Sequence, residues 1–147
     1  REWMQPDPVR SPEVLAVRTK MAETGCEFFL DVHGDEALPF VFIAGSEMLP
    51  SYSDKQARLQ QRFAEVFKLA APDFQTEHGY PSDKYTADAL KLASKWVGQA
   101  FGCLSLTLEM PFKDNDNLPD ADHGWSAERS RRLGAAVLAP ILAVLRG

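Results

Sequence analysis

Residues 27–36 of this 147-residue chain read Glu-Phe-Phe-Leu-Asp-Val-His-Gly-Asp-Glu, and this stretch decides the fold. Its first part is a short apolar run of β-forming residues, which predicts a buried strand over 27–32. The run stops abruptly at His33-Gly34, where the chain turns polar. Open α/β sheets bind ligands at the carboxyl ends of their strands, so His33 stands where a functional residue is expected.

Two further apolar runs predict the rest of the sheet. One is Pro-Phe-Val-Phe-Ile-Ala at 39–44, and the other is Cys-Leu-Ser-Leu-Thr-Leu at 103–108, with Glu109 directly after it. If the strands at 27–32 and 103–108 are parallel neighbours, the side chains of His33 and Glu109 project into one crevice. This pairing is the central prediction from the pattern alone.

Apolar residues at helical spacing, with capping residues before them and glycine or proline after them, predict the helices. The expected helices cover about 12–24, 54–71, 86–101 and 126–145. Pro140 lies inside the last of these and predicts a kink. Helices that alternate with very apolar strands indicate an α/β fold, here a partial three-layer α/β/α domain with a mixed, mostly parallel sheet. Three strands are few for such a domain, and the chain begins at Arg1, so we expect a longer parent protein.

The composition restricts the class of protein. Hydrophobic residues make up 45% and charged residues 25%, which is typical of one globular domain or a large part of one. A net charge of -5 argues against binding to nucleic acid or to an acidic membrane surface. No run of 18 apolar residues could span a bilayer. We interpret Cys26 and Cys103 as buried reduced thiols of a cytoplasmic protein, although a disulfide stays open.

The neighbours of His33 favour a functional role over that of a hydrogen-bonded turn residue. Asp31 lies two residues earlier, on the same side of the strand, and Gly34 allows close approach of the backbone. His33 and Glu36 have the spacing of a two-ligand zinc motif, which works on a helix. Because glycine follows the histidine at a junction of strand and loop, we do not expect Glu36 to be a ligand.

Glu109 is set among apolar residues. Leu108 and Met110 flank it, and such neighbours should raise the pKa of the carboxyl toward the range that a general base or acid needs. The alternative is a glutamate that turns to solvent or pairs with Lys113. The remaining polar loop residues are interpreted as surface histidines and a solvated acidic loop, namely His78 and His123, and Asp116, Asp120 and Asp122.

With these residues identified, the chain resembles the zinc metallocarboxypeptidase family, in its cytosolic-carboxypeptidase-like bacterial branch. The matching segments are Arg1-Glu2-Trp3, Asp-Val-His-Gly-Asp-Glu at 31–36, Phe-Ile-Ala-Gly at 42–45, Pro-Asp-Phe-Gln at 72–75, Glu-His-Gly-Tyr-Pro at 77–81, and Thr-Leu-Glu-Met-Pro-Phe at 107–112. The resemblance implies that residues 1–147 are the C-terminal part of the catalytic domain. It implies that His33 binds zinc, that Glu109 activates the attacking water, and that Arg1 clasps the terminal carboxylate of the substrate.

The chain also departs from the family's pattern. The early His-x-x-Glu pair of zinc ligands and the asparagine before Arg1 are both missing, and one ligand is too few for a catalytic zinc. The family's tyrosine over the substrate could be Tyr80 or Tyr85. No basic residue can be assigned to the pocket, so the sequence does not reveal which C-terminal residue is removed.

The expected function is therefore zinc-dependent hydrolysis of the C-terminal bond of a peptide or protein, by a parent protein of which this chain alone is inactive. We also expect an exposed sheet edge through which the chain self-associates. Two alternatives stay open. One is a zinc amidohydrolase of the succinylglutamate desuccinylase and aspartoacylase type, and the other is a non-catalytic α/β module.

Overall fold

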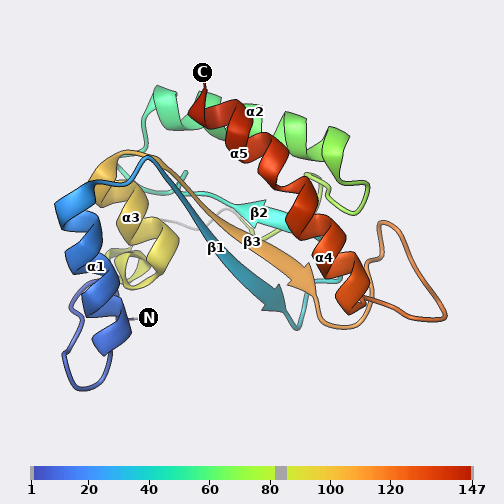
Figure 1. The fold of residues 1–147 in the computed structure, drawn as a ribbon, viewed down its shortest axis with the longest axis horizontal. Coiled ribbons are helices and arrows are strands. Elements are labelled where there is room, and N and C mark those ends of the chain that lie inside the picture. The colour runs from blue at the N-terminus through green and yellow to red at the C-terminus, as the bar shows by residue number, and fades with distance from the viewer. Residues whose placement is uncertain (1, 82–85, 147) are drawn as a thin grey trace.

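A computed structural model describes residues 2–81 and 86–146 of the chain (Figure 1). The three strands are β1 (Phe28–Asp35), β2 (Phe42–Ala44) and β3 (Leu104–Pro111). The helices are α1 (Pro12–Thr24), α2 (Asp54–Ala70), the 3-10 helix η1 (Ala87–Lys91), α3 (Ala93–Phe101), α4 (Ala127–Ala136) and α5 (Leu138–Leu145). Within the described ranges, every helix is too short or too polar to cross a membrane.

The sheet has the order β1-β3-β2, so the last strand in the sequence lies in the middle. β1 runs parallel to β3, and β2 runs antiparallel to it, which confirms the predicted mixed sheet. In the parallel register, His33 lies opposite Glu109. β1 and β3 extend further than predicted, so both of these residues stand inside strands instead of directly after them.

The prediction that the first strand is buried is wrong. Within the described residues, β1 is an edge strand that is hydrogen-bonded to a neighbouring strand on one side only. The face of β1 opposite His33 is also incompletely covered, because Val32 is 56% exposed although it belongs to an apolar run. Composition shows that a strand prefers an apolar environment, but it does not show which neighbours cover the strand.

Alternation along β3 separates the core from the functional face. One side of the strand carries leucines that pack against α2, α4 and α5, and this core contains Leu104, Leu106, Leu108, Phe63, Phe67, Leu133 and Val144. The other side carries Ser105 and Thr107, which bond to Ser94 of α3. The sheet therefore lies between two helical layers, and Figure 1 shows α3 and α5 on different sides of it. Because side chains alternate, Glu109 falls on the polar side with Thr107.

α2 begins and ends as predicted. Ser53 and Gln56 form a capping box, in which the Ser53 hydroxyl accepts from the Gln56 amide and Gln56 Oε1 accepts from the Ser53 amide. The Gln56 side chain also donates to the carbonyls of Gly98 and Cys103, at 3.2 and 3.1 Å. One buried amide thus joins the start of α2 to the end of α3 and the start of β3.

Two of the predicted helices are interrupted. The segment expected as one helix over 86–101 divides into η1 and α3 at Leu92, whose backbone is extended. The apolar spacing continues across this break, which is why the pattern does not reveal it. The last helix divides at Val137, between α4 and α5. Pro140 has no amide hydrogen to donate to the carbonyl one turn earlier, which fits an interruption of the helix at this point. The backbone of Val137 itself stays helical, so the kink remains a prediction.

The two cysteines are free thiols that lie side by side. Cys26, just after α1, has its sulfur 3.9 Å from the sulfur of Cys103. Burial, together with the neighbouring sulfur, raises the pKa of Cys103 to about 12. The prediction of reduced thiols agrees with this arrangement.

Candidate functional site

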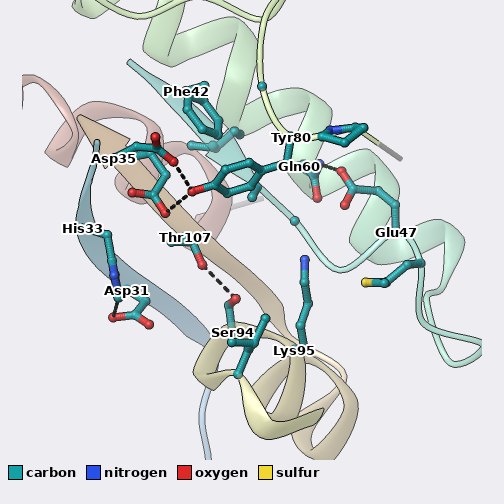
Figure 2. Close-up of a pocket in the computed structure, with 18 of the residues that line it drawn as sticks. Asp31, His33, Asp35, Phe42, Glu47, Gln60, Tyr80, Ser94, Lys95 and Thr107 are labelled. Atoms are coloured by element: carbon teal, nitrogen blue, oxygen red, sulfur yellow. Dashed lines mark hydrogen bonds and ion pairs between the residues drawn. The ribbon is translucent and has the colours of Figure 1, made fainter. Parts of the chain in front are cut away.

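A cleft lies over the polar face of the sheet, and alternate residues of two strands point into it. β1 contributes Asp31, His33 and Asp35, and β3 contributes Thr107 and Glu109. Spacing by two residues puts each set on one face of its strand, and the parallel register brings the two sets together. Figure 2 shows Asp35 beside the hydroxyl of Tyr80, which enters from the segment after α2, and His33 together with Asp31 further along β1. The predicted meeting of His33 and Glu109 in one cleft is confirmed.

His33 is oriented by its neighbour on the strand. The Nε2 atom of His33 lies 2.9 Å from Oδ1 of Asp31, as expected from their spacing (Figure 2). A carboxylate that holds one ring nitrogen fixes the orientation of the ring and leaves the other nitrogen available. The imidazole is half-exposed toward the cleft, so Nδ1 is accessible to a ligand.

Glu109 is the buried carboxyl of the site, with only 6% of its surface exposed. Its Oε1 accepts a hydrogen bond from the Tyr80 hydroxyl at 3.0 Å. Its Oε2 is buried and has no hydrogen-bond partner among the described residues. Burial raises the pKa of Glu109, and the Tyr80 hydrogen bond and His33 offset part of this rise. The alternative in which Glu109 turns to solvent or pairs with Lys113 is therefore wrong.

Tyr80 joins two carboxylates. Its hydroxyl lies 2.5 Å from Oδ2 of Asp35 and 3.0 Å from Oε1 of Glu109. Burial and these two bonds raise the pKa of the phenol. The sequence left Tyr80 and Tyr85 as equal candidates; the structure brings Tyr80 into the cleft, and Tyr85 lies outside the described residues.

Asp35 and Lys95 belong to the cleft although sequence reasoning gave neither a specific role. Asp35 appears in the sequence analysis only as part of the segment 31–36, yet its distance of two residues from His33 was the signal that it shares that face. Lys95, in the first turn of α3, is the only lysine or arginine among the described residues that line the cleft. Figure 2 shows it beside Ser94, which bonds to Thr107.

The other candidate residues are exposed or lie outside the described residues. Glu36 is exposed in the turn after β1 and lines the same cleft, and the expectation that it is not a ligand stays a prediction. His78 is exposed and stacks on Phe40 with ring centres 4.3 Å apart, and His123 is exposed beside Asp120. Arg1, predicted to bind the substrate carboxylate, lies outside the described residues.

The acidic loop after β3 is only partly the solvated loop that was predicted. It surrounds Arg129 of α4, a buried guanidinium that donates to Asp73, to Asp114 and to the carbonyls of Gly124 and Leu118. Asp116 and Asp122 are exposed, as expected. The sequence pattern missed this arrangement because Asp73 and Arg129 are 56 positions apart.

Comparison with known proteins connects this geometry to a family. No protein-family profile matches the chain. An uncharacterised protein of Zymomonas mobilis is 47% identical over 139 residues, which are 95% of this chain and 37% of that protein. A metallo-carboxypeptidase from Burkholderia cenocepacia is 64% identical with a TM-score of 0.95, over 99% of this chain and 38% of that one.

A second solved structure agrees. A metallo-carboxypeptidase from Pseudomonas aeruginosa, in complex with (2-guanidinoethylmercapto)succinic acid, is 47% identical with a TM-score of 0.92. The match covers 98% of this chain and 38% of the Pseudomonas protein. The chain thus spans less than two fifths of the length of the relatives it matches. By sequence and by structure, the chain is therefore similar to a part of these metallo-carboxypeptidases.

Proposed function

We propose that this chain is the C-terminal part of the catalytic domain of a zinc-dependent carboxypeptidase, which hydrolyses C-terminal peptide bonds. The observation that carries the proposal is the position of His33 and Glu109. They are register partners on neighbouring strands, and both face one cleft, in a chain that is 64% identical to a metallo-carboxypeptidase. The cytoplasmic location stays a prediction.

His33 fits one position in a zinc site. Its Nε2 is held by Asp31, so Nδ1 is the nitrogen left for a metal. Catalytic zinc takes three protein ligands, and the described residues contain no group of three histidines, cysteines or carboxylates that could hold a metal ion. We infer that the other ligands come from another part of the complete protein, as the resemblance implies. When bound, zinc lowers the pKa of a water molecule and polarises the carbonyl of the substrate.

Glu109 fits the role of general base. It takes a proton from the attacking water and passes the proton to the leaving amine. A carboxyl with a raised pKa binds that proton more readily than an ordinary glutamate does.

Positive charge near the cleft suits a substrate with a terminal carboxylate. The role of Arg1 as a clasp for this carboxylate rests on the resemblance, since a planar fork of donors matches a carboxylate. Lys95 supports the proposal independently, because it brings a cation to a cleft otherwise rich in carboxylates.

The complete protein that contains this chain provides the test. We expect Glu109→Gln to lower kcat on peptide substrates by a factor of about 10² to 10⁴, the range typical of general acid–base groups. Glu47→Gln is the matched control, because Glu47 lines the same cleft but accepts from Gln60. Full activity in Glu109→Gln would contradict the proposal.

The substrate class separates the proposal from its alternatives. Carboxypeptidase activity requires hydrolysis of peptides from the C-terminus, and preference for small N-acyl amino acids would favour the amidohydrolase alternative. The 147-residue chain alone, which has one candidate ligand, should be inactive with or without added zinc. Activity of this chain that a chelator abolishes would show that its own residues complete the metal site.

We also propose self-association of the isolated chain through β1. The outer edge of this strand has no strand partner among the described residues, and Val32 on it is largely exposed. Such edges pair with other edges unless they carry charge. Light scattering at rising concentration should detect dimers or larger species, and Val32→Lys should reduce them. A chain that stays monomeric throughout would contradict this proposal.

A further inference from the structure

The hydroxyl of Tyr80 occupies the space between Asp35 and Glu109. It lies 2.5 Å from Asp35 Oδ2 and 3.0 Å from Glu109 Oε1. We propose that Asp35 is a positioning residue: it anchors Tyr80, and the anchored hydroxyl holds Oε1 of Glu109 and with it the orientation of the catalytic carboxylate. This inference rests on the proposed function, because it refines the role of Glu109 in that reaction.

Asp35 is itself held firmly. It stands at the last position of β1, and its Oδ1 accepts from the backbone amides of Ala37 and Leu38, both at 2.7 Å. An aspartate that caps the following turn in this way has a fixed carboxylate plane. Its second oxygen, Oδ2, is therefore directed at the Tyr80 hydroxyl by the turn and does not depend on the tyrosine for its orientation.

The ring of Tyr80 is held by a separate contact. It meets the edge of Phe42 at a right angle, with ring centres 5.0 Å apart, and Phe42 is buried in β2. A β-carbon added at Gly79 would lie 3.3 Å from the Phe42 ring, so the backbone before Tyr80 passes close to this side chain. Ring and hydroxyl are thus fixed by different partners, and the two can be tested separately.

The arrangement engages one oxygen of Glu109. Oε1 accepts from the tyrosine hydroxyl, whereas Oε2 is buried and has no partner among the described residues. The contact at Oε1 therefore orients the whole carboxylate. Misplacement of a reacting group by about 1 Å can lower a rate about a hundredfold, so an anchor at this distance from the reaction affects kcat.

The first experiment needs no activity. Asp35→Asn in the 147-residue chain keeps an Oδ1 acceptor for the amides of Ala37 and Leu38 and replaces the acceptor at Tyr80 with an NH₂ group. We expect the ring signals of isotope-labelled Tyr80 to shift in NMR spectra, and its phenol to titrate at lower pH. Asp88→Asn is the matched control, because Asp88 also lines the cleft but pairs with Lys91.

Tyr52 serves as an internal reference in the same spectra, since its hydroxyl bonds to Gln60 and it should not respond to Asp35→Asn. An unchanged Tyr80 in Asp35→Asn would overturn the anchor. If Asp35→Asn fails to fold, Tyr80→Phe tests the other bond, because it keeps the ring against Phe42 and removes only the hydroxyl. It should shift the side-chain carboxyl signal of Glu109, and an unchanged signal would overturn the proposal.

The second experiment uses the complete enzyme. Asp35→Asn and Tyr80→Phe should each lower kcat about tenfold to a hundredfold with KM nearly unchanged, and the double variant should be no worse than either alone. Effects that multiply would show that the two residues act independently, which overturns the proposal. If instead Glu109→Gln retains full activity, the proposed function fails, while the NMR result still reports whether Asp35 anchors Tyr80.

Discussion

Carboxylates gather at two places in this molecule, and they have opposite surroundings. Around Arg129, Asp73 and Asp114 meet a buried guanidinium, and each bond has its partner. In the cleft, Asp35 and Glu109 meet one phenol, and one oxygen of Glu109 has no partner among the described residues. In the Arg129 cluster, both carboxylates bond to the guanidinium. In the cleft, Glu109 has one oxygen without a hydrogen-bond partner among the described residues.

The pKa shifts follow this difference. Backbone amides of Asp120 and Asn115, together with Arg129, hold the pKa of Asp114 below its ordinary value. Burial raises the pKa of Glu109. A carboxylate that stabilises the fold has hydrogen bonds and ion pairs that favour its ionised form. A carboxylate that acts on a substrate lacks some of these partners, which lowers the stability of the folded protein.

Removing the centre of the satisfied cluster should have the largest effect on stability. Arg129→Ala leaves two carboxylates facing one another in a buried loop, and we expect a loss of about 3–5 kcal/mol in the free energy of unfolding, measured in urea. The control is Arg131→Ala on the same helix, where the ion pair with Glu128 is exposed and is worth about 0–1 kcal/mol. Equal losses for both variants would contradict the comparison.

The same measurement on the cleft should give the contrary result. Glu109→Gln removes a buried charge with an unpaired oxygen, so the free energy of unfolding should stay within about 1 kcal/mol of the original or rise. The same variant should be inactive in the complete enzyme. A loss of stability comparable to that of Arg129→Ala would show that Glu109 holds the fold together, which would weaken its assignment as a base.

The smallest expected effect is a change in pH dependence. Asp114 has a lowered pKa in the folded chain, so its stabilising contribution is present above its ordinary pKa of 3.8 and is lost as the pH falls through the folded-state value. Unfolding at a series of pH values should therefore show Asp114→Asn less stable than the parent at pH 6 and the difference narrowing below about pH 3.8. A difference that does not change with pH would mean that the charge of Asp114 contributes nothing.

Local patterns in the sequence predict the residues of the cleft better than they predict the cluster around Arg129. The order of strands and helices and the capping of α2 follow from spacing within short segments. The pairing of His33 with Glu109 needed one further premise, that their two strands are parallel neighbours. His33 and Asp31 share a face because they are two residues apart, and this needs no knowledge of the rest of the fold.

Contacts between distant segments could not be predicted in the same way. Arg129 meets Asp73 across 56 positions, and Tyr80 meets Asp35 across 45. Nothing in the neighbourhood of Arg129 separates it from the exposed Arg131 and Arg132, which follow it in the sequence. The position of β1 at the edge of the sheet likewise depends on how three strands are ordered, which the apolar run does not contain.

The division of β3 into two faces limits how this protein can vary. The leucines of the strand face the core, and Glu109 faces the cleft. A deletion of one residue between 104 and 109 would therefore point leucine side chains into the cleft or the Glu109 carboxyl into the core. This strand can therefore accept substitutions, which keep its length, but not the deletion or insertion of one residue. Differences in substrate preference among its relatives should therefore arise in α3 and the loops, where an insertion does not move core side chains into the cleft.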